Sequence, residues 1–451
     1  MELKGKKVVV VGLGRSGQAS ARLLTFLGAE VWVTDQRSSQ ELAQEITMLK
    51  GQPVRFSLGG HPASVFSGAA LAVVSPGVSP AGLIGCSAPI MGEVELAFRH
   101  LTASLVAITG TNGKSTTTAL VGEMLKAWGK RVFVGGNLGI PLCEAALSAL
   151  SATGGGRDLF EWVVAEVSSF QMETIETFRP RIAVLLNATP NHQDRYAHFQ
   201  DYLSAKLRIF SNQTKSDFAV VNLDDPVLRS IPPTLKARVV PISRRERPEG
   251  GVWMEGDRLI SGLSGRRVIA RRSEILLRGE HNLENVLAAV AVAQLAGCPT
   301  EVIQKIISQF PGLEHRLETV RRRREVLYVN DSKATTVAAT ACALESFEEP
   351  VILIAGGRDK GGDFQSLRPI LSRKAIAVIL IGEAREKIRT ALEGTTPIYE
   401  AMSLREAVER AAALASPGHV VLLSPGCASF DMFRDFEDRG RQFKALVASV
   451  S

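Results

Sequence analysis

Residues 109–116, Thr-Gly-Thr-Asn-Gly-Lys-Ser-Thr, are of the types that bind phosphate groups. The two glycines let backbone N–H groups curl around phosphate oxygens, and a following helix N-terminus adds partial positive charge. At this position in the motif, Lys114 is expected to reach the β- and γ-phosphates. The hydroxyl of Ser115 or Thr116 is expected to bind Mg²⁺. The usual motif has one more glycine, at the position of Ile108, so this loop is a shortened form. We interpret it as an ATP site, the alternative being a chance Gly-Lys-Ser turn.

The segments on either side of this loop favour the ATP site. The apolar run 105–108 predicts a buried strand, and apolar residues from Leu120 to Trp128 recur at helical spacing. Gly129 is placed as a helix stop. A strand, a glycine turn and a helix in this order form a phosphate-binding loop.

A second glycine-rich turn lies near the N-terminus. A strand over 8–11 leads into Gly12-Leu-Gly-Arg-Ser-Gly17, and the next strand, 31–34, ends on Asp35. This pattern is typical of dinucleotide binding, with the acidic residue placed to hold a ribose hydroxyl. Any pyrophosphate fits such a turn, so the pattern does not separate NAD from a nucleotide-sugar, and a purely structural turn stays open. A strand running into a loop over 71–78 is expected to line the same crevice.

Polar residues end three strands of the middle region. The strand 162–166 ends on Glu166, which we expect as an outer Mg²⁺ partner unless it is only a solvated strand end. A strand over 182–186 precedes a polar segment, 187–196, that contains His192, and the strand at 133–137 ends on Asn137. These strand ends are expected at one edge of a parallel sheet.

Two helical segments complete this region. A helix over 199–210 carries Lys206, which resembles an ordinary surface lysine. A second helix opens with Asn282 and Asn285 one turn apart, either as ligand contacts or as a polar first turn with an N-cap. Arginine pairs in the short strands between 238 and 280 lack interleaved aromatic residues, so they predict solvated edge strands and not a nucleic-acid surface.

The last region alternates strands and helices again. Strands are expected at 327–329, 351–354, 377–381 and 420–423. Polar loops follow three of them, at 330–335, 356–360 and 424–429, and together they could form a second wall for a ligand. Cys427 lies in the last loop, where we expect a structural role because no nearby histidine supports a nucleophile.

Composition sets the class. The 451 residues are 45% hydrophobic and 22% charged, with a net charge of +7 that suits acidic small substrates such as nucleotides. No apolar run approaches the roughly 18 residues of a membrane span, and the N-terminus leads straight into a strand, so we expect no signal peptide. Five scattered cysteines suit reduced thiols in a cytoplasm. We expect an α/β protein of three domains: Rossmann-like over 1–99, a central P-loop ATPase-like parallel sheet over 100–311, and Rossmann-like again over 312–451.

The chain resembles the Mur ligases and folylpolyglutamate synthases over essentially its whole length. Its phosphate loop, 109–116, is similar to the ATP loop of that group. Further resemblance lies in 12–17, Glu166-Val-Ser-Ser-Phe-Gln171, Ala205-Lys-Leu-Arg208, Gly312-Leu-Glu-His-Arg316, Asn330-Asp-Ser-Lys-Ala-Thr335 and Ser424-Pro-Gly-Cys-Ala-Ser-Phe-Asp431. These stretches are similar to those of the Mur ligases that join D-glutamate to UDP-N-acetylmuramoyl-L-alanine. The resemblance therefore implies a cytoplasmic ligase of peptidoglycan precursor synthesis, which serves cell-wall biogenesis, cell shape and cell division.

The resemblance also implies roles for individual residues. For ATP it implies Gly110, Thr111, Asn112, Gly113, Lys114, Ser115, Thr116, Asn282, Asn285, Arg316 and Asp331. For the UDP-linked substrate it implies Gly14, Arg15, Ser16, Asp35, Arg37, Gly77 and Asn137. For D-glutamate it implies Lys333, Thr335, Lys360, Ser429, Phe430 and Phe436. We expect Lys114, Lys206, His192 and Glu166 to be catalytic.

Two Mg²⁺ ions are implied as well, held through Ser115, Glu166, His192 and a carbamylated Lys206. Relatives commonly carry aspartate before the metal-site histidine, whereas this chain has Asn191, which removes a charge beside the site. We expect a monomer that binds neither nucleic acid nor membrane.

Three other functions remain alternatives. An NAD-dependent oxidoreductase would explain 12–17 and leave the ATP loop unexplained. A nucleic-acid motor ATPase would need a strand ending in Asp-Glu and a stacking surface, neither of which the sequence shows. Among the ligases, a folylpolyglutamate-type substrate is the nearest rival hypothesis, and the glycine-rich region at 12–17 argues against it.

Overall fold

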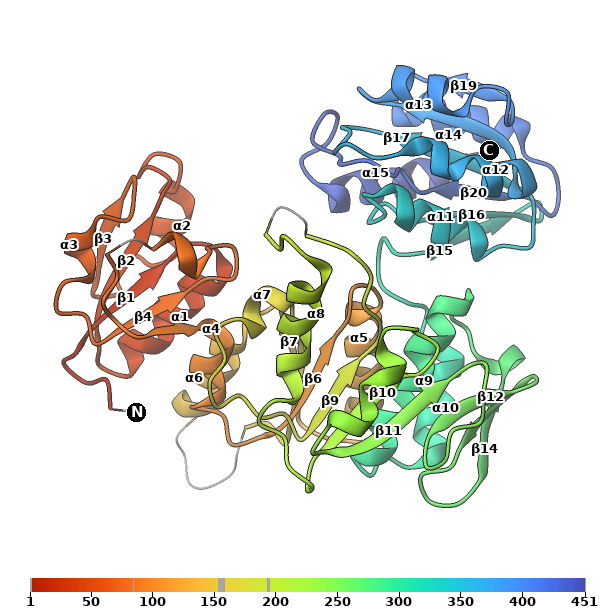
Figure 1. The fold of residues 1–451 in the computed structure, drawn as a ribbon. Helices are drawn as coiled ribbons and strands as arrows, with labels where there is room; N and C mark the ends of the chain where they lie inside the picture. The colour runs from red at the N-terminus through yellow and green to blue at the C-terminus, as the bar shows by residue number, and fades with distance from the viewer. Residues whose placement is uncertain (1, 84, 153–158, 193–194, 451) are drawn as a thin grey trace. The chain divides into compact units, whose positions relative to one another are not determined.

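A computed structural model describes residues 2–83, 85–152, 159–192 and 195–450, which form three β-sheets with covering helices (Figure 1). The chain divides into two compact units. One holds the residues up to 272 together with 284–306, and the other holds 273–283 together with the residues from 307 on. The first unit contains two of the sheets and the second unit the third.

The first sheet is parallel, in the order β3-β2-β1-β4-β5. Its strands are β1 (Lys7–Val11), β2 (Glu30–Asp35), β3 (Val54–Leu58), β4 (Leu71–Val74) and β5 (Ile90–Gly92), and its helices are α1 (Arg15–Phe26), α2 (Ala43–Thr47), α3 (Ala63–Phe66) and α4 (Glu93–Phe98). Along β1, Val8 and Val10 belong to one apolar cluster and Val9 and Val11 to another. Both faces of the strand are therefore buried, as parallel sheets require.

The second sheet has the order β14-β13-β12-β11-β10-β9-β6-β8-β7. Its strands are β6 (Ser104–Thr109), β7 (Val132–Gly136), β8 (Trp162–Glu166), β9 (Ile182–Leu185), β10 (Phe218–Asn222), β11 (Arg238–Ser243), β12 (Val252–Glu255), β13 (Arg258–Ser261) and β14 (Arg267–Arg271). Its helices are α5 (Lys114–Ala127), α6 (Leu142–Ser151), α7 (Ser169–Met172), α8 (Phe199–Leu207), α9 (Glu280–Leu295) and α10 (Thr300–Gln309). The sheet is parallel from β7 to β12, and β13 and β14 add an antiparallel edge. The arginine pairs at 266–267 and 271–272 lie at the two ends of β14, whereas the pair at 244–245 follows β11, where Arg244 forms an ion pair with Glu284 at 2.9 Å and is not on a solvated edge strand.

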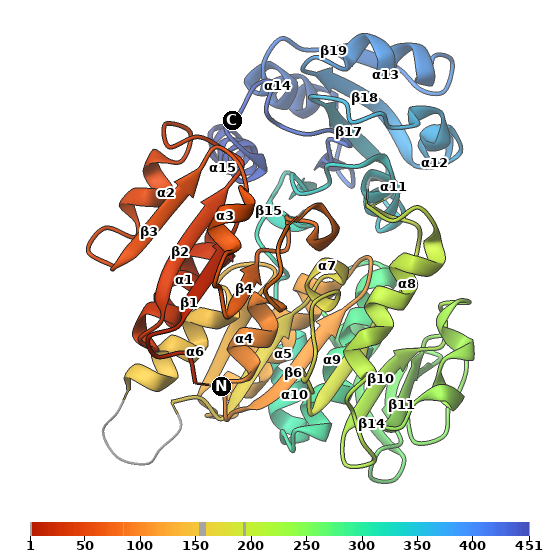
Figure 2. The ribbon, with the colours of Figure 1, turned by 60° about the vertical axis from the view of Figure 1, so that its left-hand side comes forward.

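The third sheet has the order β15-β16-β20-β17-β18-β19 and is parallel except for the edge strand β15. Its strands are β15 (Glu318–Arg323), β16 (Val326–Asn330), β17 (Val351–Gly356), β18 (Ala375–Ile381), β19 (Ile398–Glu400) and β20 (Val420–Leu423). Helices α11 (Val337–Glu345), α12 (Arg368–Lys374) and α13 (Arg385–Leu392) cover one face, and α14 (Leu404–Leu414) and α15 (Phe436–Ser449) cover the other (Figure 2). Short 3-10 turns lie at Pro80–Gly82, Arg208–Phe210, Leu228–Ser230, Pro232–Thr234, Arg272–Glu274 and Phe364–Leu367.

The expected α/β class and the strands predicted around the glycine loops are confirmed. The helix predicted over 199–210 is shorter, because α8 tightens into a 3-10 turn at Arg208. In the part of the chain that the structure describes, none of the helices has both the length and the apolar character of a membrane span.

A buried carboxylate joins the first sheet's last helix to the second sheet. Glu95 of α4 accepts hydrogen bonds from the backbone N–H groups of Glu176, Thr177 and Phe178, and pairs with Arg99 at 2.7 Å. Burial raises the pKa of Glu95, but these donors outweigh it, so the pKa lies below its ordinary value. Glu95 therefore stabilises the fold above the ordinary glutamate pKa, and this stabilisation is lost as the pH falls through the lowered value.

We predict that Glu95→Ala lowers the free energy of unfolding by about 3 kcal/mol, because it leaves buried N–H groups without an acceptor. Urea denaturation followed by circular dichroism measures this loss. Glu123→Ala, which removes an exposed ion pair with Lys126, is the matched control and should change stability by less than about 0.5 kcal/mol. Equal effects of the two substitutions would contradict the role of Glu95.

Candidate active site

The phosphate loop joins the end of β6 to the start of α5. Gly113 has φ +84°, and a Cβ atom there would lie 2.1 Å from Asn285 Oδ1, so only glycine fits. Gly110 has φ +155°. The ammonium group of Lys114 lies over the loop and donates to the carbonyl oxygens of Gly110, at 3.0 Å, and Thr111, at 2.9 Å. The residues predicted to bind phosphate thus lie together in one loop at a helix N-terminus, the geometry that suits an anion.

The segment after β9 holds this loop in place. The Asn112 backbone N–H donates to Asn187 Oδ1 at 2.8 Å, and Asn187 Nδ2 donates back to the Asn112 carbonyl. The Thr111 hydroxyl lies 3.0 Å from the Tyr202 hydroxyl and donates to the Thr189 carbonyl. The loop therefore keeps its shape through contacts with two segments, the one after β9 and α8.

Glu166, at the end of β8, faces the phosphate loop. Its side chain is buried, and it accepts a hydrogen bond from the Ser115 hydroxyl at 2.6 Å and one from Asn137 Nδ2 at 2.9 Å. Both donors are neutral groups, and Glu166 forms no ion pair among the described residues. A carboxylate beside a loop hydroxyl is the oxygen set that Mg²⁺ prefers, so the residues fit that ion.

Lys206 is not the surface lysine that its place in a helix suggested; that expectation was wrong. It is 2% exposed, and its Nζ donates to the Gly110 carbonyl at 2.9 Å and lies 4.6 Å from the centre of the Tyr202 ring. Burial and the nearby Lys114 lower its pKa to about 7, and Glu166 only partly opposes them. A large share of this amine is neutral at neutral pH, the state that reacts with CO₂.

His192 lies in the segment after β9, with a positive φ of 55° and its backbone N–H bonded to Asn191 Oδ1 at 2.9 Å. Its ring packs 4.7 Å from the centre of the Phe170 ring. Gln193 and Asp194, in the predicted loop, lie outside the described residues. The described side chains contain no group of three His, Cys, Asp or Glu that could hold a metal. Of Ser115, Glu166, His192 and Lys206, two are such residues and only Glu166 is a carboxylate, so a carbamate on Lys206 would supply a second anionic ligand.

A further cavity, of about 210 Å³, lies at the carboxyl ends of β1 to β4. Its lining residues are Gly12, Asp35, Gln36, His61, Gly77, Val78, Ser79, Gly82 and Leu83.

The glycine turn beside this cavity leaves no room for side chains. Gly12 has φ +90°, and a Cβ atom on Gly17 would lie 1.8 Å from the Gly12 carbonyl oxygen, so both positions require glycine. The turn brings Gly14 and Ser16 to the start of α1, and Arg15 donates to the Gly139 carbonyl at 3.4 Å. The sequence did not predict a role for His61, because a single histidine after two glycines matches no binding motif.

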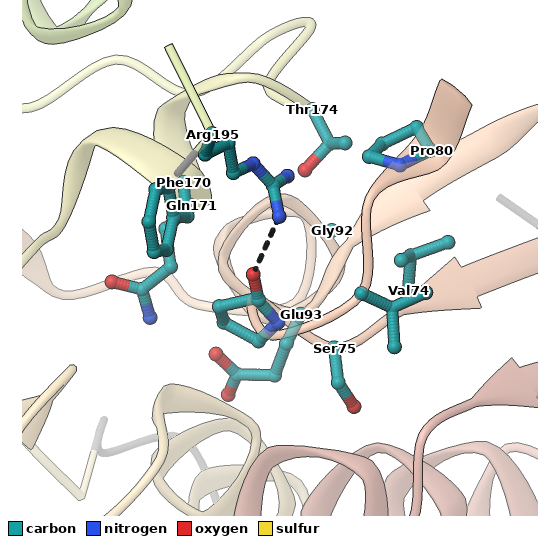
Figure 3. Close-up of a pocket in the computed structure, with 11 residues that line it drawn as sticks. Val74, Ser75, Pro80, Gly92, Glu93, Phe170, Gln171, Thr174 and Arg195 are labelled. Carbon is teal, nitrogen blue, oxygen red and sulfur yellow. Dashed lines mark hydrogen bonds between the residues drawn. The ribbon is translucent and has the colours of Figure 1, made fainter. Parts of the chain in front are cut away.

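Arg195 links the first sheet's loop after β4 to the segment that carries His192 (Figure 3). Its guanidinium donates to the Pro76 carbonyl at 3.4 Å, pairs with Glu173 and lies over the Phe170 ring. The enclosed space around it is only about 10 Å³, the size of one water molecule. This is a packed junction and not a substrate cavity.

In the second unit, Asp331 follows β16 and is fully enclosed. It accepts from the Ser424 hydroxyl at 2.8 Å and from the Leu317 backbone N–H at 3.1 Å. Burial raises its pKa to about 7, although these donors and the charges of Arg316 and Arg439 oppose the rise. Arg316 itself is half-buried.

The three predicted polar loops of this unit do meet. The buried Arg439 donates to the Ser332 carbonyl at 2.8 Å and to the Cys427 carbonyl at 3.3 Å, and the Arg358 N–H donates to the Ala428 carbonyl. Sequence reasoning missed Arg439, because an arginine inside an amphipathic helix usually faces solvent. Cys427 is buried, as expected.

The predicted amino-acid-binding residues differ in exposure. Lys333 lies 5.7 Å from the centre of the Phe436 ring, and Ser429 is buried. The Thr335 N–H bonds to the Lys333 carbonyl, Lys360 is exposed, and Phe430 is 62% exposed. Phe430 thus has little contact with the loop core.

The two asparagines of α9 have different partners. Asn285 Oδ1 accepts from the Thr117 hydroxyl of α5 at 3.3 Å, beside the phosphate loop. Asn282 Nδ2 donates to the Arg278 carbonyl at 2.8 Å, in the second unit. In the first unit, then, the structure brings the phosphate loop, Glu166, Asn137, Lys206 and Asn285 together.

Comparison with known proteins accounts for most of the chain. The Mur ligase MurD-like N-terminal domain matches residues 6–84, the Mur ligase middle domain matches 108–293, and the Mur ligase glutamate ligase domain matches 315–427. The UDP-N-acetylmuramoylalanine--D-glutamate ligase of Syntrophotalea carbinolica is 44% identical over 454 residues, covering 100% of this chain and 99% of the relative. The enzyme of the same name from Trichlorobacter lovleyi is 45% identical, covering 99% of each chain.

Solved structures share the fold. A pseudomurein peptide ligase type C from Methanothermus fervidus aligns with a TM-score of 0.61 at 20% identity, covering 99% of this chain and 100% of that one. The UDP-N-acetylmuramate-alanine ligase of Thermotoga maritima has the same TM-score and identity, covering 98% and 99%.

We predict that Lys114→Ala weakens ATP binding at least about 10-fold, because a charge-assisted contact to the phosphates is lost. Isothermal titration calorimetry with ATP and Mg²⁺ measures the affinity. Lys126→Ala, on the exposed face of the same helix, is the matched control and should bind as the wild type does. If Lys114→Ala bound ATP within about twofold of the wild type, this role of Lys114 would be wrong.

We also predict a carbamate on Lys206. In ¹³C-labelled bicarbonate, the wild-type protein should show a carbamate carbon resonance that is absent from Lys206→Arg, since guanidinium does not react with CO₂. The signal should grow from pH 6 to pH 8, because the neutral fraction of an amine with a pKa of about 7 rises over that range. Identical spectra for the two proteins would exclude the modification.

Proposed function

The chain belongs to the Mur ligase family, and from that membership and the geometry of the phosphate loop we propose that it is the ATP-dependent ligase that joins D-glutamate to UDP-N-acetylmuramoyl-L-alanine. The product serves peptidoglycan synthesis. The observation that carries the proposal is the cradle of Lys114 and Ser115 beside the buried Glu166, in a chain whose full-length relatives bear that ligase's name.

The first step activates a carboxylate. An oxygen of the substrate's terminal L-alanyl carboxylate attacks the γ-phosphorus of ATP, the bond from that phosphorus to the β–γ bridging oxygen breaks, and ADP leaves. Lys114 and the backbone N–H groups of the loop stabilise the charge on the transferred phosphoryl group. Ser115 and Glu166, with His192, would hold Mg²⁺, which when bound would neutralise charge on the phosphate oxygens.

The second step forms the amide. The neutral amine of D-glutamate attacks the carbonyl carbon of the acyl phosphate, the C–O bond to phosphate breaks, and inorganic phosphate leaves as the amine loses a proton. Lys333 and the polar loops held by Arg439 supply cations and hydroxyl groups suited to the two carboxylates of D-glutamate. We assign Lys333, Thr335, Lys360, Ser429 and Phe436 to this substrate.

Lys206 acts through its carbamate. As an ammonium ion it would repel Mg²⁺, whereas the carbamate carries carboxylate-like oxygens and the charge that the described metal set lacks. The depressed pKa, set mainly by burial, makes the neutral amine available.

The nucleotide end of the substrate belongs to the cavity after β1 to β4. Gly14, Arg15, Ser16 and Gly77 border the pyrophosphate, and Asp35 and Arg37 lie on the uridine side. All five cysteines are unpaired, which suits a cytoplasmic enzyme, and we assign a monomer as its working form.

We predict that ADP and phosphate appear only when UDP-N-acetylmuramoyl-L-alanine, D-glutamate and Mg²⁺ are all present. A coupled assay of ADP release measures this, with L-glutamate and meso-diaminopimelate as matched alternative amines. Comparable turnover with either alternative would contradict the assignment of D-glutamate.

A further inference from the structure

The cavity at the carboxyl ends of β1 to β4 contains a histidine that no motif assigns. His61 follows β3 and lines this cavity together with Asp35 and Gln36 from the end of β2. The inference below rests on the proposed function, in that it takes a uridine nucleotide as the occupant. It concerns how the cavity distinguishes that base from others.

The hydrogen bonds around Thr34 fix which nitrogen of His61 carries the proton. The Thr34 hydroxyl has one hydrogen, which it donates to the Gly60 carbonyl at 2.8 Å. The same oxygen lies 3.1 Å from His61 Nδ1, so Nδ1 must be the donor in that contact. In a neutral imidazole the other nitrogen, Nε2, is then an acceptor. Burial lowers the pKa of His61, with Asp35 opposing, which supports the neutral ring.

His61 Nε2 remains open to a ligand. Across the described part of the chain, Thr34 is the one hydrogen-bond partner of the His61 ring. Nε2 is not among the buried side-chain atoms that lack a partner. The backbone before His61 is held to the end of β2, since the Gly59 N–H donates to the Arg37 carbonyl and the Gly60 N–H to the Asp35 carbonyl. Together with the Thr34 contact, these bonds restrict the ring of a residue that lines the cavity.

Asp35 is poorly suited to the same task. Its Oδ2 accepts from the Leu13 N–H at 2.8 Å and from Arg37 Nη2 at 3.1 Å. Its Oδ1 accepts from the Arg37 N–H at 2.9 Å and Nε at 3.2 Å. These hydrogen bonds occupy both carboxylate oxygens, and the one from Leu13 holds the glycine turn against the end of β2. Among the titratable groups of the cavity, His61 Nε2 is then an acceptor that these contacts leave for a base, beside the uncharged side chains of Gln36 and Ser79.

We propose that His61 is a specificity-determining residue that accepts a hydrogen bond from the N3–H of uracil through Nε2. Uracil presents a donor at N3 between two carbonyl oxygens, whereas cytosine presents an acceptor at N3. A fixed acceptor in the wall pairs with the first and repels the second. The cavity thereby selects UDP-linked over CDP-linked substrates.

The test is the binding of UDP and CDP, measured by isothermal titration calorimetry without ATP. Wild-type protein should prefer UDP by about 10-fold to 100-fold, as expected for one buried hydrogen bond. His61→Phe keeps an aromatic ring without the acceptor and should reduce this preference to within about threefold. His61→Gln offers a carbonyl oxygen and should restore part of the preference. His419→Phe, a histidine substitution in the second unit, is the matched control.

Turnover separates this role from a structural one. His61→Phe should raise KM for the UDP-linked substrate and leave kcat nearly unchanged, with a circular dichroism spectrum like that of the wild type. A UDP/CDP preference that survives His61→Phe would overturn the inference, and so would a wild-type protein that binds the two equally. Neither result would contradict the proposed function, because that function is tested separately by turnover with D-glutamate.

Discussion

The hydrogen bond between the Ser115 hydroxyl and the Glu166 carboxylate, at 2.6 Å, is the contact on which the catalytic centre depends. It joins the phosphate loop of one strand to the end of the neighbouring strand, and Asn137 of a third strand completes the set. The carboxylate is buried, and both of its hydrogen bonds there come from neutral donors. A carboxylate beside a phosphate loop would need a cation when ATP binds, because the polyphosphate brings further negative charge.

Parallel strand order explains why these groups meet. The strands β7, β8, β6 and β9 are neighbours, and each ends at the same edge of the sheet, where polar side chains leave the buried apolar run. The first sheet repeats the arrangement with the cavity at the carboxyl ends of β1 to β4, and the third with its three polar loops. Helix packing on both faces leaves these edges as the places where backbone groups remain open to ligands.

Sequence predicted the parts of this centre that have local patterns. Strand–glycine–helix order located the phosphate loop, and an apolar run ending in one carboxylate located Glu166. Lys206, His61 and Arg439 had no such pattern, because their roles come from tertiary burial. Lys206 is the penultimate residue of a short helix, where propensity favours solvent, and only the packing of α8 against the loop reveals an amine of lowered pKa. Family resemblance singled out Lys206 where residue patterns did not.

The central claim is that this geometry activates a carboxylate by phosphoryl transfer, and isotope transfer tests it most directly. UDP-N-acetylmuramoyl-L-alanine labelled with ¹⁸O in its terminal carboxylate is turned over with ATP and D-glutamate, and the inorganic phosphate is analysed by mass spectrometry. The account predicts one ¹⁸O atom in each phosphate formed, because the attacking carboxylate oxygen leaves with the phosphoryl group. Amide product accompanied by unlabelled phosphate would contradict it.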